Sequence, residues 1–154
     1  MRRRLVVFVC TGNVCRSPMA EFLLRRKLGP SSDWTVTSAG VSAIPAMPAS
    51  NNAVAVLAEE GVDLTPHRSR QLARDLVDAA SVIVVMTAGH CSQVQTLFRN
   101  AREKLFLLRS FDPAAESGDL DDPIGAEVET YREIRDAIES ALPGLIEFLR
   151  GLHI

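Results

Sequence analysis

A short stretch from Cys10 to Pro18, CTGNVCRSP, constrains the fold of this chain more than any other feature. It directly follows the apolar run LVVFV (5–9), whose β-branched and aromatic residues are typical of a buried strand. Ser17 followed by Pro18 predicts the start of a helix, with the serine as N-cap and the proline as the first helical residue. Backbone N–H groups of such a loop and the positive end of the helix point into one concavity, where we expect an anion to bind.

The rest of the chain alternates strand and helix patterns. Further strands are predicted at 34–38, 81–86 and 104–108, helices at 18–28, 52–60, 68–79 and 89–98, and a loop with glycine and prolines at 39–50. The order predicts an α/β three-layer sandwich, with a central four-stranded parallel sheet flanked by helices and the phosphate-binding loop after the first strand. With 154 residues and 47% apolar content, the chain is expected to form a single domain over 1–154.

The last third of the chain contains a long loop and a long helix. The segment 112–125 has prolines, glycines and five acidic residues, which predicts an exposed loop. Long loops in compact domains are often functional. From Val128 onward, apolar residues keep helical spacing, and we expect Pro143 to kink or divide this helix.

Composition excludes several classes of function. A formal net charge of −2 argues against a nucleic-acid partner, and the basic run 2–4 is interpreted as solvated residues before a strand. The apolar run that follows is too short for a targeting signal, and no segment has the length needed to span a membrane. The chain has three cysteines, Cys10, Cys15 and Cys91, and their spacing shows no disulfide pattern. We therefore expect a cytoplasmic protein.

Cys10 and Arg16 lie at opposite ends of the loop, so that both can face one bound oxyanion. Cys10 as a nucleophile requires a thiolate, and the helix N-terminus, the loop amides and Arg16 all stabilise negative charge there. A planar guanidinium binds two phosphoryl oxygens at once. Ser17 is expected to cap the helix, to donate a hydrogen bond to the Cys10 sulfur, or both. The alternative for Cys10 is an inert cysteine at the end of a buried strand.

Phosphoryl transfer also needs an acid that protonates the leaving oxygen. Two Asp-Pro pairs in the long loop compete for this role, Asp112 with Pro113 and Asp122 with Pro123. Asp-Pro is often only a turn, so the dipeptide alone does not decide. We favour Asp122 because it lies nearer the last helix and is followed by Ile124 and Gly125, which could form a structured rim.

CTGNVCRSPMAE, followed by SAG, HRSRQL, VVMT and DDPIG, resembles the low-molecular-weight protein tyrosine phosphatases over nearly the whole chain. The resemblance implies that Cys10 forms a phosphocysteine, that Arg16 binds the phosphoryl group and that Asp122 acts as general acid and then base. It further implies that Asn13 shapes the loop and that His67 buttresses it by hydrogen bonding. A monomer acting on a phosphorylated protein substrate, without metal or cofactor, is the expectation that follows.

The resemblance also assigns phosphate binding to the whole loop: Thr11, Gly12, Asn13, Val14, Cys15, Arg16 and Ser17. In the family, a cysteine at the position of Cys15 can form a reversible disulfide with the nucleophile and so protect it from irreversible oxidation. Cys91 has no evident partner. A metal site built from the cysteines with His67 and His90 has poor ligand spacing.

The sequence leaves two substrates to be distinguished, phosphotyrosine and phosphoarginine. Arsenate reductases of this fold need two further cysteines downstream, and only Cys91 is present. Phosphoarginine phosphatases carry threonine where this loop has Val14, whose apolar side chain is typical of tyrosine enzymes. Ile124 and the loop 39–50, however, supply none of the aromatic rim residues that sandwich a phenol ring. Phosphotyrosine is favoured, phosphoarginine is the alternative, and a non-catalytic phospho-ligand binding module is a third interpretation.

Overall fold

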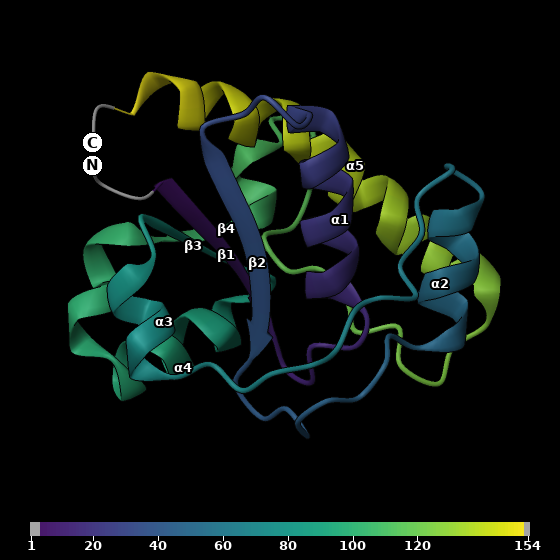
Figure 1. Ribbon diagram of the computed structural model, residues 1–154, viewed down its shortest axis with the longest axis horizontal. Coiled ribbons are helices and arrows are strands. Elements are labelled where there is room, and N and C mark those ends of the chain that lie inside the picture. Colours follow the sequence, from purple (N-terminus) through teal and green to yellow (C-terminus); the bar gives the residue numbers. More distant parts are fainter. Residues whose placement is uncertain (1–3, 153–154) are drawn as a thin grey trace.

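Four parallel strands form one sheet in the order β2-β1-β3-β4 (Figure 1). The structure is a computed structural model that describes residues 4–152. The strands are β1 (Arg4–Cys10), β2 (Trp34–Gly40), β3 (Val82–Val85) and β4 (Leu105–Leu107). Residues 2 and 3 of the basic run lie outside the described residues. The predicted four-stranded parallel sheet is confirmed.

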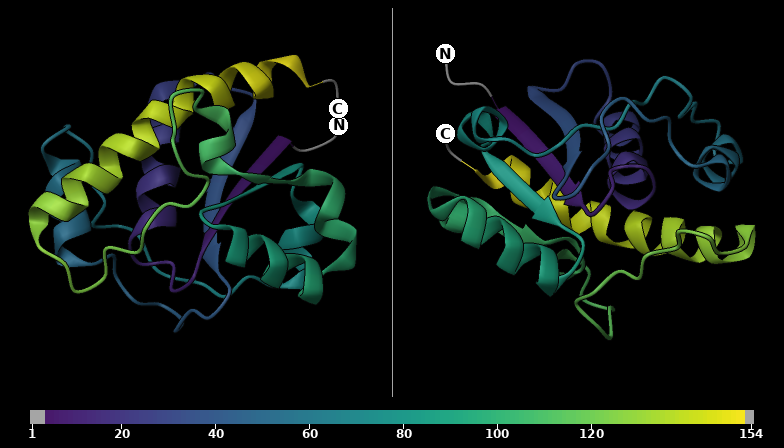
Figure 2. Two further views of the ribbon diagram at one scale, coloured as in Figure 1. Left: turned by 180° about the vertical axis from the view of Figure 1, so that it is seen from behind. Right: turned by 90° about the horizontal axis from the view of Figure 1, so that it is seen from below.

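Helices cover both faces of the sheet. On one face lie α1 (Arg16–Leu28) and α5 (Val128–Gly151), with α2 (Asn51–Ala58) packed against α5; on the other lie α3 (Arg74–Ala79) and α4 (Ala88–Leu97) (Figure 1). Two 3-10 turns, Arg99–Lys104 and Leu108–Phe111, flank β4. Seen from behind, α5 crosses the sheet diagonally, and the segment that precedes it runs past the loop after β1 (Figure 2). The three-layer α/β sandwich is therefore confirmed.

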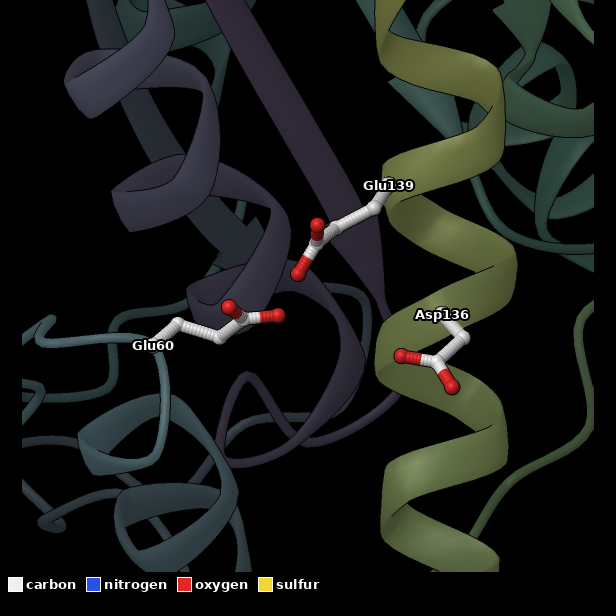
Figure 3. Close-up of side chains that lie close together, drawn as sticks. All are labelled: Glu60, Asp136 and Glu139. Atoms are coloured by element: carbon white, nitrogen blue, oxygen red, sulfur yellow. The ribbon is translucent and has the colours of Figure 1, made fainter.

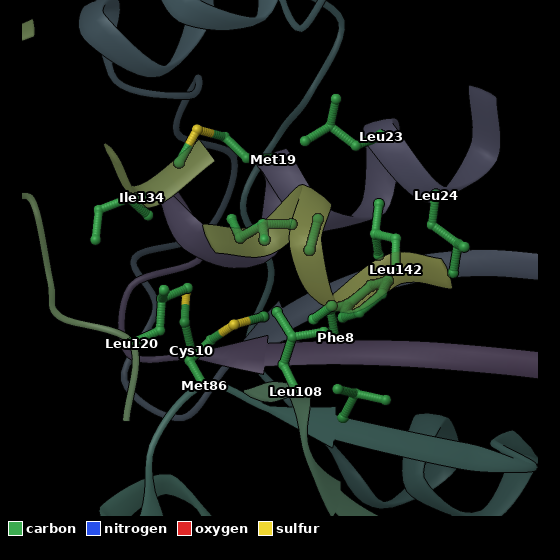
Figure 4. Close-up of a cluster of buried hydrophobic side chains, with 14 of the residues drawn as sticks. Phe8, Cys10, Met19, Leu23, Leu24, Met86, Leu108, Leu120, Ile134 and Leu142 are labelled. Atoms are coloured by element: carbon green, nitrogen blue, oxygen red, sulfur yellow. The ribbon is translucent and has the colours of Figure 1, made fainter. Parts of the chain in front are cut away.

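The central strand β1 alternates between the two cores. Val6, Phe8 and Cys10 join the cluster shared with α1 and α5, which Figure 4 shows around Phe8 and Met19. Leu5, Val7 and Val9 join the cluster under α3 and α4. All six are buried, and burying a large apolar side chain contributes roughly 1.5–3 kcal/mol. Period-two alternation thus points the Cys10 side chain toward α1.

The helix predicted at 68–79 is wrong in its first half, because α3 begins only at Arg74. The preceding backbone has other partners. Arg70 N donates to Asn13 Oδ1 (2.9 Å), and Arg70 O accepts from Gly40 N (2.9 Å). The segment before α3 is therefore held extended between β2 and the loop after β1, so its amides are not available to a helix.

The helix cap predicted at Ser17 is also wrong. Helix α1 begins at Arg16, Cys15 occupies the cap position, and no side chain caps the helix. Ser17 lies inside the first turn, and its hydroxyl is used in the site described below. Pro18 is compatible with this turn because the first helical N–H groups have no intrahelical acceptor.

Helix α5 continues from Val128 to Gly151 with Pro143 inside it, so the predicted division does not occur. The next residue, Gly144, lies against the turn Leu108–Phe111: a Cβ there would be 2.1 Å from the Phe111 carbonyl oxygen. Segment 112–125 contains no helix or strand, as predicted. Within residues 4–152, no helix is both long and apolar enough to cross a bilayer.

Candidate active site

The segment between β1 and α1 lies at the carboxyl end of the sheet, where ligands bind in open parallel sheets (Figure 1). The residues directly after β2 fix its backbone: Val41 N donates to Cys10 O (3.0 Å) and Ser42 N donates to Thr11 O (2.9 Å). Gly40 permits this approach, because a Cβ there would lie 2.4 Å from the Thr11 carbonyl oxygen. The glycine of the SAG motif therefore serves the loop after β1.

Asn13 adopts a left-handed conformation, with φ of 58°, which asparagine tolerates better than most residues. It is fully buried, and its side chain makes three hydrogen bonds. Nδ2 donates to Ser17 Oγ (2.8 Å) and to Ser38 Oγ (2.9 Å), while Oδ1 accepts from Arg70 N (2.9 Å). These bonds tie the loop to α1, to β2 and to the segment before α3, so they hold the unusual backbone conformation.

His67 supports the same loop from outside. Its Nε2 donates to the Asn13 carbonyl oxygen at 2.7 Å, so the proton of the neutral ring lies on Nε2. Burial lowers the pKa of His67, and the bond to Asn13 opposes this shift only in part. The Phe22 ring packs edge-on against the imidazole, with centroids 6.3 Å apart. This is the contact that the family resemblance led us to expect.

Cys10 ends β1 with its side chain buried, and its Sγ lies 2.9 Å from Ser17 Oγ. Because Ser17 Oγ already accepts from Asn13 Nδ2, its own proton is free to point at the sulfur. A hydroxyl donor stabilises negative charge on a thiolate. The geometry thus supplies the hydrogen bond to sulfur that was expected of Ser17.

Arg16 is buried behind the loop, with 3% of its surface exposed. Its Nη1 donates to the Leu120 carbonyl oxygen at 2.8 Å, and its Nη2 lies 3.5 Å from Asp122 Oδ2. The Leu120 N–H donates in turn to Met86 O (2.9 Å), which anchors the long loop on β3. The Arg16 Nε is buried without a hydrogen-bond partner, so this edge of the guanidinium keeps a donor for a bound oxyanion.

The two candidate acids lie in different places. Asp122 lines the same cavity as Cys10, with 44% of its side chain exposed, and its Oδ1 accepts from Ile124 N (3.1 Å). Asp112 instead follows the turn Leu108–Phe111, where its Oδ1 accepts from Ala114 N (2.9 Å), and it is absent from the cavity wall. Only Asp122 shares a cavity with the thiol.

This catalytic cavity has a volume of about 210 Å³. Its wall consists of Cys10, Thr11, Gly12, Val14, Cys15, Arg16, Asp122 and Ile124. Two apolar side chains, Val14 and Ile124, therefore stand beside the polar groups, and 58% of Ile124 is exposed. An aliphatic rim of this kind can contact the apolar part of a substrate side chain.

Cys15 is the second thiol in the cavity wall. Its Sγ lies 3.3 Å from Ser50 Oγ and 3.3 Å from Tyr131 Oη, and burial raises the pKa of the thiol. Burial likewise raises the pKa of Tyr131 to about 12. Cys15 is therefore expected to stay protonated. It is a free thiol, as are Cys10 and Cys91.

Sequence reasoning missed three residues of the site. Ser38 holds Asn13 and donates to Glu21 Oε1 (2.6 Å), and Leu120 offers its carbonyl to Arg16. The third, His90, is 2.8 Å from Thr11 Oγ1 through Nε2, and its buried Nδ1 has no hydrogen-bond partner. The SAG motif could have indicated Ser38, because the motif is part of the family resemblance. His90 is a lone histidine in a predicted helix and Leu120 is a leucine in a loop, so the sequence gives no indication that either contacts the site.

One group of three acidic side chains lies close enough to share a cation, counting only residues 4–152. Figure 3 shows Asp136 and Glu139 on α5 and Glu60 opposite them. Arg135 is within ion-pair distance of all three, at 3.1–4.0 Å, so a guanidinium already balances part of this charge. Since none of the three lines the catalytic cavity, this cluster is not part of the site.

Comparison with protein families gives one match that covers most of the chain. The model described as "Low molecular weight phosphotyrosine protein phosphatase" matches residues 5–151. A protein-arginine-phosphatase of Geobacillus stearothermophilus is 41% identical over 145 residues, which cover 94% of this chain and 95% of that protein. The low molecular weight protein-tyrosine-phosphatase Etp of Escherichia coli is 34% identical over 142 residues, which cover 92% of this chain and 86% of that protein.

Solved structures agree with these sequences. A mutant of YwlE arginine phosphatase with a phosphorylated active-site serine has a TM-score of 0.89 and 34% identity, and the match covers 96% of both chains. A low molecular weight protein tyrosine phosphatase from T. tengcongensis has a TM-score of 0.88 and 35% identity, with 94% of this chain and 99% of that chain covered. The similarity thus extends from the loop after β1 to the whole fold.

Proposed function

The chain belongs to the low-molecular-weight phosphotyrosine protein phosphatase family, and we propose that it hydrolyses phosphotyrosine in proteins through a covalent phosphocysteine. The observation that carries the proposal is the catalytic cavity itself. Cys10, Arg16 and Asp122, which are far apart in the sequence or on different elements, line one space of about 210 Å³. A nucleophile, an oxyanion binder and a carboxyl group are the three parts that phosphomonoester hydrolysis requires.

In the first step, the Cys10 thiolate attacks phosphorus, the S–P bond forms and the bond from phosphorus to the leaving oxygen breaks. The Asp122 carboxyl group, in its protonated form, donates its proton to that oxygen. The buried Arg16 guanidinium and the loop amides hold the other phosphoryl oxygens, whose negative charge spreads as the leaving group departs. Asp122 is suited to reach the leaving group because its side chain is half-exposed at the cavity mouth.

In the second step, a water molecule attacks the phosphocysteine. The Asp122 carboxylate takes a proton from this water, the P–O bond forms, and the S–P bond breaks with its electrons returning to sulfur. Ser17 donates to the departing sulfur from 2.9 Å and so stabilises the thiolate. Asn13 and His67 act as positioning residues that hold the loop in its left-handed conformation.

Phosphoarginine is the second candidate substrate. It is favoured by the relatives named arginine phosphatases and by the aliphatic character of Ile124, the exposed apolar residue in the cavity wall. An aromatic rim would sandwich a phenol ring, whereas an aliphatic rim has no such preference. The apolar Val14 inside the cavity supports phosphotyrosine. Both substrates would use the same three groups.

A comparison of two substrates tests whether the enzyme prefers phosphotyrosine. Turnover of matched phosphotyrosine and phosphoarginine peptides is measured for the wild type and for Val14→Thr, with an aryl phosphate as a common reference. The proposal expects a higher kcat/KM for phosphotyrosine in the wild type and a shift toward phosphoarginine in the variant. A higher kcat/KM of the wild type for phosphoarginine would show that phosphoarginine, and not phosphotyrosine, is the substrate. Phosphate binding without any turnover would instead indicate a binding module.

We also propose the oligomeric state, the domain organisation and the compartment of the enzyme. It acts as a monomer, with one low-molecular-weight phosphatase domain over 1–154, on phosphorylated proteins in the cytoplasm. Free thiols at Cys10, Cys15 and Cys91 support a reducing compartment. The reaction derived above needs neither metal nor cofactor.

A further inference from the structure

A second cavity, of about 370 Å³, adjoins the catalytic one. The two share Thr11, Arg16 and Asp122 as a common wall. The remaining wall comes from the start of α4 and from the end of the long loop: Thr87, Gly89, His90, Gln93, Asp119, Leu120 and Asp121. The second cavity therefore lies directly beside the space that the phosphorylated side chain of a substrate would enter.

Negative charge dominates this second cavity. Asp119, Asp121 and Asp122 contribute three carboxylates against one guanidinium, that of Arg16, which is buried. Asp119 Oδ1 accepts from Ala88 N at 2.8 Å, and this bond offsets the partial positive charge at the start of α4. Among the described residues, the Asp121 carboxylate has no hydrogen bond or ion pair, so its charge is available to a ligand.

His90 adds an unused polar atom to the same wall. The side chain lines the second cavity, the residue is 4% exposed, and Nδ1 has no hydrogen-bond partner. When Nε2 carries the proton and donates to Thr11 Oγ1, Nδ1 offers a lone pair. Burial, followed by the Arg16 charge, lowers the pKa of His90 to about 4, so the ring adds no positive charge near neutral pH.

We propose that the second cavity is a specificity subsite for a cationic side chain, arginine or lysine, next to the phosphorylated residue of the protein substrate. This inference rests on the proposed phosphatase function. Carboxylates and a neutral imidazole acceptor suit a guanidinium or ammonium group, and they disfavour an acidic neighbour. The shared wall couples the two cavities, because Asp122 faces both of them.

The test compares two peptides that carry the same phosphorylated residue and differ only in its neighbour, arginine in one and glutamate in the other. The ratio of their kcat/KM values is measured for the wild type, Asp121→Asn and Gln93→Lys. Gln93 is exposed on α4 and lines the cavity together with the acidic residues of the long loop. We expect the wild type to prefer the arginine peptide, and each variant to lower the ratio by about three- to fivefold, as for one partly exposed ion pair.

Gln95→Lys is the matched control, because it adds the same charge to the same helix at an exposed residue outside the cavity wall. Its ratio should stay near that of the wild type. A wild-type ratio near one, or equal effects of the two lysine variants, would overturn the subsite. Hydrolysis of a small aryl phosphate reports on the proposed function alone: with activity there but no peptide preference, only the subsite fails, whereas inactivity there contradicts both.

Discussion

At the scale of single residues, the choice between two aspartates decides the acid of the reaction. Asp122 lies 3.5 Å from Arg16 in the wall of the catalytic cavity, whereas Asp112 lies outside it. We expect Asp122→Ala to lower kcat by about 10²–10⁴-fold and Asp112→Ala to leave it within about twofold. Rates on a series of aryl phosphates check this result: the loss should grow as the leaving group becomes poorer. Equal losses in both variants would contradict the assignment.

Cys15 gives a second prediction at this scale. Two free thiols, Cys10 and Cys15, line one small cavity, and burial keeps Cys15 protonated. After mild peroxide, the sulfenic acid formed on Cys10 should condense with Cys15 to a disulfide, which a dithiol reductant reverses. Intact mass before and after reduction measures it. Persistent sulfinic acid on Cys10 in the wild type, as in Cys15→Ser, would show that Cys15 gives no protection.

Individual residues also show where sequence reasoning reaches its limit. The thiol, the arginine and the loop asparagine follow from a local pattern. The structure brings Cys10 and Arg16 together with Asp122 in one cavity, whereas Asn13 is buried outside the cavity wall and bonds to Ser17. Of the two roles expected of Ser17, the cap of α1 is absent, whereas its hydroxyl does lie within hydrogen-bond distance of the Cys10 sulfur. His90 could not be found, because only the packing of α4 beside the loop brings its ring to Thr11. Contacts between distant segments are a tertiary property that local patterns do not contain.

At the scale of elements, α5 carries a glycine for a reason that helix propensity does not provide. Gly144 lies against the turn after β4, with only 2.1 Å between its prospective Cβ and the Phe111 carbonyl oxygen. Gly144→Ala should therefore destabilise the protein by roughly 1–3 kcal/mol, although alanine is the better helix former. Urea unfolding measures the change.

Gly151 provides the control within the same helix, because a Cβ there meets no atom within 4 Å. Gly151→Ala should be neutral or slightly stabilising. A stable Gly144→Ala variant would mean that α5 and the turn after β4 are not in contact as described.

The elements also explain which boundaries could be predicted. Strands β1 and β3 follow directly from apolar runs that are covered on both faces. The helix expected at 68–79 begins at Arg74, because the backbone before it pairs with β2 and with Asn13. Pro143 does not divide α5, since packing of Leu142 and Leu145 in the core keeps the helix continuous. In both places tertiary contacts override a local preference.

At the scale of the whole molecule, two buried neutral histidines make stability depend on pH. Burial lowers the pKa of His90 to about 4 and also lowers that of His67. The unfolded chain binds protons near pH 6.5, but the folded chain resists them until a lower pH. The two neutral histidines therefore leave the free energy of unfolding undiminished above about pH 6.5. Below that pH the protein loses stability, because the unfolded chain binds protons that the folded chain does not take up until the pH falls toward 4.

Thermal unfolding midpoints of the wild type and His90→Gln between pH 8 and pH 4 measure this dependence. The amide of glutamine can still bond to Thr11 but does not titrate. The variant should lose less stability on acidification than the wild type does. Parallel curves for the two proteins would show that His90 takes up its proton without opposing the fold.

The proposed mechanism requires Cys10 to carry the phosphoryl group. The direct measurement is rapid-quench intact mass of Asp122→Ala mixed with an aryl phosphate, followed by peptide mapping, because loss of the general base slows hydrolysis of the intermediate. We predict a single phosphoryl adduct on Cys10 in this variant, and no turnover in Cys10→Ser. Turnover that persists in Cys10→Ser, or an adduct on any other residue, would contradict the central claim.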